Sequence, residues 1–159
     1  MSDTNKRPDT VSPWSFQLGS FGGIPVRIHF TFLLFVAWLA WVSQSGDAGM
    51  RVLLVLALFL CVLLHEFGHA FSAKRHGIPT RDITLYPIGG IAMLQGRPNP
   101  KQELEIALAG PAVNVLIALV LVPIIFLVEK RPPALSFGLD GKPFLDALLT
   151  ANLYLVFFN

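Results

Sequence analysis

The side chains best suited to catalysis are concentrated in one short stretch, Leu63–Ala73, which reads LLHEFGHAFSA. On a helix, the spacing of His65 and His69 places both imidazoles on one face, where they can bind one Zn²⁺, and leaves Glu66 beside them as a general base. Ionisable groups at membrane depth cost about 2.5–3.5 kcal/mol each, so three of them in an apolar run indicate a metal-hydrolase site. The alternative is a pair of buried histidines satisfied by neighbouring carbonyls, but Glu66 would then also need a partner.

The composition predicts a membrane protein. The chain has 159 residues, of which 53% are hydrophobic and 14% charged, which is too apolar for a soluble domain. We therefore expect the lipid bilayer as a partner, and no nucleic acid, while the membrane-embedded site indicates transmembrane protein substrates. The single cysteine, Cys61, excludes an internal disulfide. It lies one turn before His65, so a metal-ligand role is conceivable, but the HExxH geometry does not require it and a core thiol is the preferred interpretation.

We predict an all-α polytopic membrane protein with about four transmembrane helices, the last of them incomplete. Residues 1–13 read as a disordered tail, and residues 14–159 as one transmembrane metalloprotease core, truncated at its end. The segment Trp14–Arg27 is interpreted as an interfacial lead-in with aromatic anchors. The expected spans are about 28–43, 52–73, 104–128 and 144–159.

The distribution of lysine and arginine predicts the orientation. Eight of them fall in the tail and the connection between the second and third spans, and four on the opposite side. By the positive-inside rule the N-terminus is cytoplasmic, in a multi-pass protein of the cell membrane. His29 and His76 stand near span ends, and we interpret both as interfacial side chains and not as ligands.

Two segments next to the second span carry further signals. Arg81–Gln95 has short apolar runs on either side of Gly89-Gly90, which predicts a short hairpin or a re-entrant loop, with a tight surface turn as the alternative. Asn99 and Pro100 are a typical N-cap and first residue for the third helix. Within that helix Asn114 either forms an interhelical hydrogen bond or lines the site.

Several of these motifs together resemble the site-2 protease family of intramembrane zinc metalloproteases. The similarity is carried by GGIPVRIHFTF at the entrance, HEFGH, YPIGGIA and AGPAVN, and it covers most of Phe16–Asn159. In that family a motif NxxPxxxxDG follows in the next span, and its Asp is the third zinc ligand. Asn159 matches the opening Asn of that motif, so the resemblance implies a catalytic role for Asn159 at the oxyanion and a third ligand beyond residue 159. Asp146 is the nearest internal acid, but it lies about two turns or more from the depth of His65.

The resemblance implies a zinc metalloendopeptidase with one Zn²⁺ that hydrolyses peptide bonds in or near transmembrane segments, as in regulated intramembrane proteolysis. Glu66 would take a proton from the attacking water and pass it to the leaving amine. Two alternatives remain open. One is a catalytically inactive relative that binds membrane segments, and the other is a polytopic metal-binding transporter.

Overall fold

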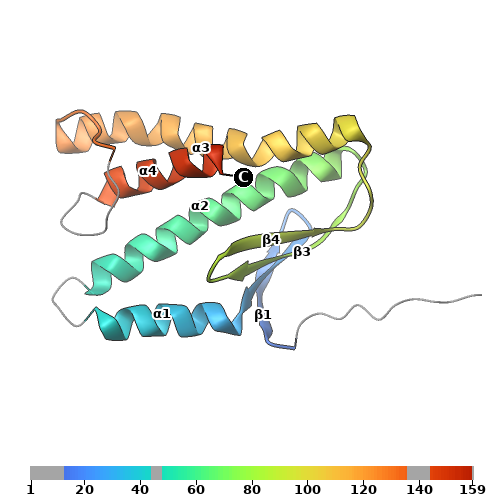
Figure 1. Ribbon diagram of the computed structural model, residues 1–159, viewed down its shortest axis with the longest axis horizontal. Coiled ribbons are helices and arrows are strands. Elements are labelled where there is room, and N and C mark those ends of the chain that lie inside the picture. The colour runs from blue at the N-terminus through green and yellow to red at the C-terminus, as the bar shows by residue number, and fades with distance from the viewer. Residues whose placement is uncertain (1–12, 44–47, 136–143, 159) are drawn as a thin grey trace, which may run out of the picture.

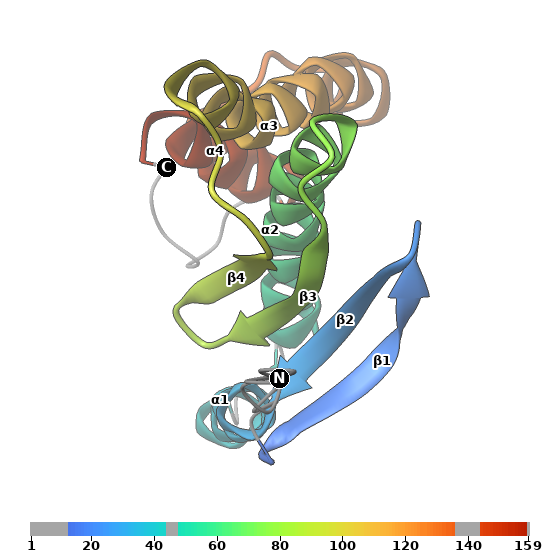
Figure 2. The same ribbon diagram turned by 90° about the vertical axis from the view of Figure 1, so that its right-hand side faces the viewer.

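The computed structural model describes residues 13–43, 48–135 and 144–158. Its elements follow the order β1 (Ser15–Phe21), β2 (Ile24–His29), α1 (Phe30–Val42), α2 (Ala48–Arg75), β3 (Thr80–Tyr86), β4 (Gly89–Leu94), α3 (Pro100–Glu129) and α4 (Phe144–Phe157). Helix α2 lies in the middle of the molecule, with α3 and α4 on one side and α1 and the sheet on the other (Figures 1 and 2). The tail expected for residues 1–13 lies, apart from Pro13, outside the described residues.

The four strands form one mixed sheet in the order β1-β2-β3-β4. The β1–β2 and β3–β4 pairs are antiparallel, whereas β2 and β3 are parallel and place Val26 opposite Ile83. Both of these side chains are fully buried. Because parallel neighbours need a long crossover connection, α1 and α2 together form the link between β2 and β3. The sheet therefore joins segments on both sides of the HExxH helix.

The all-α prediction is wrong, because the segment expected to be an interfacial lead-in is a β-hairpin. Gly22 and Gly23 have φ angles of 58° and 81°, the positive values that a two-residue type I′ hairpin turn requires. Pro25 is the second residue of β2, near the strand start where a proline is tolerated. The segment Arg81–Gln95, for which the sequence predicts a short hairpin or a re-entrant loop, contributes the β3–β4 hairpin to the same sheet.

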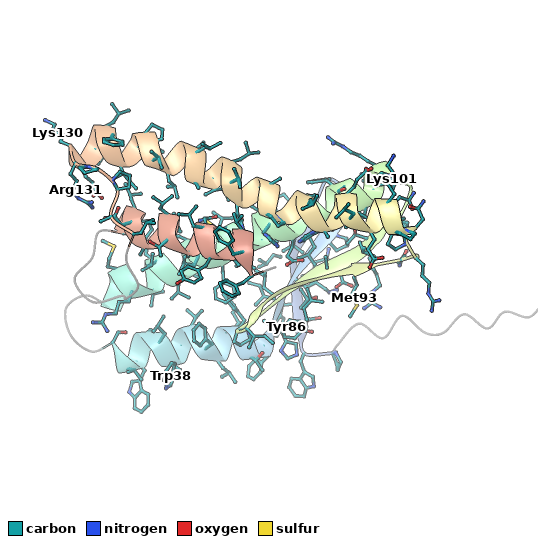
Figure 3. The ribbon with its side chains drawn as sticks, turned by 45° about the horizontal axis from the view of Figure 1, so that its top comes forward. Trp38, Tyr86, Met93, Lys101, Lys130 and Arg131 are labelled. Carbon is teal, nitrogen blue, oxygen red and sulfur yellow. The ribbon has the colours of Figure 1, made fainter. Side chains whose placement is uncertain are left out.

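The prediction of four transmembrane helices is also wrong. Among the described residues, two helices are long and apolar enough to cross a membrane, α2 with 28 residues and α3 with 30. Helices α1 and α4 have 13 and 14 residues, or about 20 Å, which is shorter than the ~30 Å hydrocarbon core. Lys101 and Lys130 mark the opposite ends of α3 (Figure 3). The large apolar side chains exposed between these ends are suited to lipid.

The rotation of α2 is fixed by the sheet. Leu63, Phe67 and Ala70 lie on one face of the helix and pack against a cluster that includes Ile24 and Ile83 of the sheet. The end of α2 is tied to the β1–β2 turn by Lys74, whose Nζ donates to the Gly22 carbonyl at 2.9 Å. As a result, the HExxH residues are held between the sheet and α3.

Helix α3 begins as its sequence predicts and packs on two neighbours. Asn99 is the N-cap, and it forms a reciprocal capping box with Gln102. Near this end, Ile106 packs with residues of α2 and the following loop. Further along, α3 forms a second buried cluster with α4 through Ala118, Leu121, Ile125 and Leu149. The middle of α3, between these two contacts, passes the histidines of α2.

Candidate metal centre

The two imidazoles of the HExxH motif point at one another. The Nε2 atoms of His65 and His69 are 3.0 Å apart, and their rings meet edge to face with centroids 4.7 Å apart. Two nitrogens bound tetrahedrally to one zinc at 2.0–2.1 Å would be about 3.3 Å apart. The pair thus stands within a few tenths of an ångström of the separation that a shared metal ion requires.

The opposite nitrogen of each ring is engaged by α3. His69 Nδ1 lies 2.7 Å from the Ile106 carbonyl, and His65 Nδ1 lies 2.9 Å from Asn114 Nδ2. A carbonyl can only accept, so His69 carries its proton on Nδ1 and keeps the Nε2 lone pair for a ligand. Metal-binding histidines are usually oriented in this way by a partner on the other ring nitrogen. His65 is 4% exposed, so its contact with Asn114 is protected from water.

Gly110 leaves the space beside the two metal-facing nitrogens open. A Cβ atom at this position would lie 2.2 Å from His69 Nε2 and 2.7 Å from His65 Nε2. Any other residue would press on both nitrogens, so glycine is needed here for close approach and not for its backbone freedom. The donor set, its spacing and this open position fit a zinc ion. Among the described residues, however, no group of three His, Cys, Asp or Glu side chains is placed to hold a metal.

Glu66 lies on the side of α2 that faces β4. Its carboxylate accepts a hydrogen bond from the main chain of Ala92. A Cβ on Gly90 would come within 2.6 Å of Glu66 Cγ, so β4 passes directly over this side chain. The contact orients a carboxylate beside the two imidazoles, which is the position of a general base in an HExxH site.

Gly68, between Glu66 and His69, permits the close crossing of α2 and α3. A Cβ there would lie 2.6 Å from the Ala109 carbonyl oxygen. Because that neighbour is main chain, it cannot turn aside. Helix α3 therefore approaches α2 closely at Gly68, and this crossing brings Ile106, Gly110 and Asn114 to the histidines.

The other candidate residues do not join this cluster. Asp146, buried at the start of α4, hydrogen-bonds Arg131 and the main chain of Ala134. Its hydrogen bond to Arg131, reinforced by Glu129, raises the pKa of the guanidinium above its ordinary value. Cys61 is buried and contacts the side chain of Asn152.

Three further residues were considered for the site: His29, His76 and Asn159. His29 caps α1 through Thr31 and stacks on Tyr86, with ring centroids 4.8 Å apart. His76 pairs with Glu105 at 2.9 Å. Both have partners away from the metal centre. Asn159 lies outside the described residues.

Converging imidazoles beside a carboxylate, on a helix long enough to cross a membrane, are the arrangement of a membrane metal hydrolase. Residues 53–157 match Peptidase family M50, and the chain belongs to this family of zinc metalloproteases. The site-2 protease resemblance that the motifs suggest is thereby confirmed.

Individual relatives support the same family. The chain is 35% identical over 146 residues to a zinc metalloprotease of Methanocaldococcus jannaschii, covering 92% of this chain and 41% of that protein. It is 30% identical over 158 residues to a candidate zinc metalloprotease of Synechocystis sp., covering 91% and 40%. The solved site-2 protease from Methanocaldococcus jannaschii superposes with a TM-score of 0.66 at 34% identity, covering 91% of this chain and 63% of that one. The chain thus spans about two fifths of the length of these curated relatives.

Proposed function

We propose that the intact protein is an intramembrane zinc endopeptidase that cleaves transmembrane segments of other membrane proteins. The observation that carries the proposal is the 3.0 Å approach of the His65 and His69 Nε2 atoms on a membrane-length helix, with Glu66 in the same turn. His65 and His69 would hold the metal. When bound, zinc supplies a Lewis acid and lowers the pKa of water toward neutrality.

Glu66 provides the proton transfer in this proposal. Its carboxylate takes a proton from the attacking water and returns it to the leaving amine. The Ala92 main-chain contact holds the carboxylate in place for both transfers. A third protein ligand is expected beyond residue 159, where the family motif begun by Asn159 would continue.

The substrate is proposed to bind as an extended strand along the outer edge of β4, on either side of the Ala92 N–H that donates to Glu66. Strand β4 ends the sheet, and its main chain meets Glu66 at Ala92. A helical substrate hides its peptide bonds, so it must unwind before hydrolysis, and strand addition offers hydrogen bonds to the unwound segment. The edge of β4 would then place a scissile peptide bond next to the catalytic carboxylate.

The substrate pose can be tested from the substrate side. The probe is a labelled synthetic apolar peptide with a central Gly-Gly pair, incorporated in vesicles with the full-length protein. Replacing single peptide bonds of the probe by esters removes one N–H at a time, at about 1 kcal/mol or about fivefold in kcat/KM for each hydrogen bond lost. Strand addition predicts losses at every second position. Losses without this alternation would exclude the proposed pose.

The catalytic assignment is tested by Glu66→Gln, with the same probe. We expect hydrolysis to fall by at least a hundredfold while zinc content stays at the wild-type level, because the amide cannot take a proton but leaves both imidazoles intact. His65→Ala and His69→Ala should lose zinc and activity together. Treatment with a chelator should abolish cleavage, and added zinc should restore it.

The same variant separates the alternatives. A metal transporter predicts that Glu66→Gln reduces zinc flux across the vesicle membrane, and a binding relative predicts that the wild-type protein binds the peptide without cleaving it. Cleavage by Glu66→Gln at the wild-type rate would overturn the proposal.

We also propose that the N-terminus is cytoplasmic. This orientation can be checked by introducing a cysteine in the tail and labelling it from either side of the membrane.

A further inference from the structure

The sheet face that points away from α2 changes character at its last strand. On β2 and β3 this face carries Arg27, Asp82 and Thr84, and the Thr84 hydroxyl donates to Asp82 Oδ1 at 3.0 Å. On β4, Ile91 lies opposite Thr84, and Met93 lies opposite Asp82. The two apolar side chains are 45% and 46% exposed, whereas the two polar ones are buried. A polar face therefore ends in a pair of half-exposed apolar side chains at the edge of the sheet.

The opposite face of β4 carries small residues. Ala92 packs against the buried cluster that joins the sheet to α2, and a Cβ on Gly90 would lie 2.6 Å from Glu66 Cγ. Successive side chains of a strand point to opposite faces. Gly90 and Ala92 thus face α2, while Ile91 and Met93 face away from it. Strand β4 has one side that α2 and Glu66 occupy and another that is open and apolar.

A strand added to the outer edge of β4 would continue both faces. Neighbouring strands lie about 4.8 Å apart, and side chains directly opposite one another have Cβ atoms about 4.5–5.5 Å apart. Substrate side chains opposite Gly90 or Ala92 would point toward α2, where Glu66 leaves little room. Those opposite Ile91 or Met93 would point away from α2, and large apolar side chains would cover this pair best.

We propose that Ile91 and Met93 determine substrate specificity, by selecting large apolar residues at alternate positions of the bound segment, with small residues between them. This inference rests on the strand addition of the proposed function, and it names the class of segment that fits. Segments that alternate residues such as leucine or phenylalanine with glycine, alanine or serine would match both faces of β4. Because the selection acts through buried apolar surface and not through proton transfer, its effect belongs in KM.

The first test uses the full-length protein in vesicles with the labelled apolar peptide probe. Ile91→Ser and Met93→Ser should each raise KM about threefold to tenfold and leave kcat within about twofold of the wild type. Leu18→Ser is the matched control, because Leu18 is 62% exposed on β1, at the other edge of the sheet. An unchanged KM in both β4 variants would overturn the inference, and so would an equal rise in the control.

The second test identifies the paired position by an exchange of charge. Met93→Glu places a carboxylate at the edge of β4 and should raise KM for the apolar probe. A lysine scanned along the probe should recover most of this loss at the position opposite residue 93, because opposite charges across a strand pair attract. Lysine at the next position points to the other face and should recover none. Leu18→Glu, with the same probes, should show no recovery at any position.

The outcomes separate this inference from the proposed function. If the wild-type protein cleaves no probe, the proposed function itself fails. If the wild type cleaves the probe and the ester series shows alternating losses, but lysine recovers Met93→Glu at no position or equally at adjacent positions, only the specificity role of Ile91 and Met93 is refuted.

Discussion

Gly110 of α3 lies so close to His69 of α2 that a Cβ atom at residue 110 would be 2.2 Å from Nε2 and 2.5 Å from Cε1 of the imidazole. The atoms that would clash belong to a side chain, which can rotate, and not to main chain. A larger residue at position 110 would therefore be accommodated by moving the imidazole and not the helices. The relationship links a glycine of one helix to the metal-binding capacity of another.

Gly110→Ala should abolish stoichiometric zinc binding with little loss of stability. The displaced His69 no longer shares a metal position with His65, whereas alanine itself favours the helix by up to ~1 kcal/mol over glycine. Zinc per protein, measured by atomic emission, and the melting temperature in detergent check the two parts. The matched control is Gly49→Ala in α2, where a Cβ would meet nothing within 4 Å. Full zinc content in Gly110→Ala would contradict the prediction.

Gly90→Ala should separate catalysis from metal binding. The new Cβ would press on Glu66 Cγ, which lies 2.6 Å away, and turn the carboxylate out of place. We expect kcat for the peptide probe to fall tenfold or more, with zinc content unchanged. Gly19→Ala is the control, because its Cβ would make only an ordinary 3.5 Å contact with the Phe21 ring. Equal kcat values in the two variants would show that β4 does not position Glu66.

Asp146→Asn should destabilise the protein without removing zinc. The carboxylate is buried and holds Arg131 and the Ala134 main chain, so it fixes the start of α4 to the end of α3. Loss of the charge weakens the contacts with Arg131 and with the Ala134 N–H, although Glu129 still pairs with the guanidinium, and the melting temperature should fall by a few degrees. Glu105→Gln, at the half-exposed His76 pair, should have a smaller effect. Loss of zinc at an unchanged melting temperature would instead make Asp146 a ligand.

His29→Ala should lower stability modestly and leave zinc content unchanged. Its side chain caps α1 and stacks on Tyr86, and loss of an N-cap typically costs about 1 kcal/mol. His29→Asn, which retains a capping side chain, should recover part of the loss in melting temperature. Loss of zinc in either variant would contradict the assignment of His29 to the helix cap.

The sequence by itself determined those features that depend on neighbours a few residues apart. The i, i+4 spacing of His65 and His69 and the cap at Asn99 are local patterns, and each is found where the sequence predicts it. Helices α2 and α3 likewise contain the apolar runs expected at 52–73 and 104–128, although both extend several residues beyond them. The same local reading failed for β1 and β2, because aromatic residues, glycines and a proline are compatible with both an interfacial segment and a short hairpin.

Only the tertiary structure decided which distant groups meet at the metal centre. Ile106 lies 37 residues from His69, and Asn114 lies 49 residues from His65. The parallel pairing of β2 with β3 likewise spans two intervening helices. Such contacts depend on how whole elements pack, and no periodicity within one element encodes them. The HExxH motif thus supplied the chemistry, whereas helix crossing and sheet pairing decided which partners orient it.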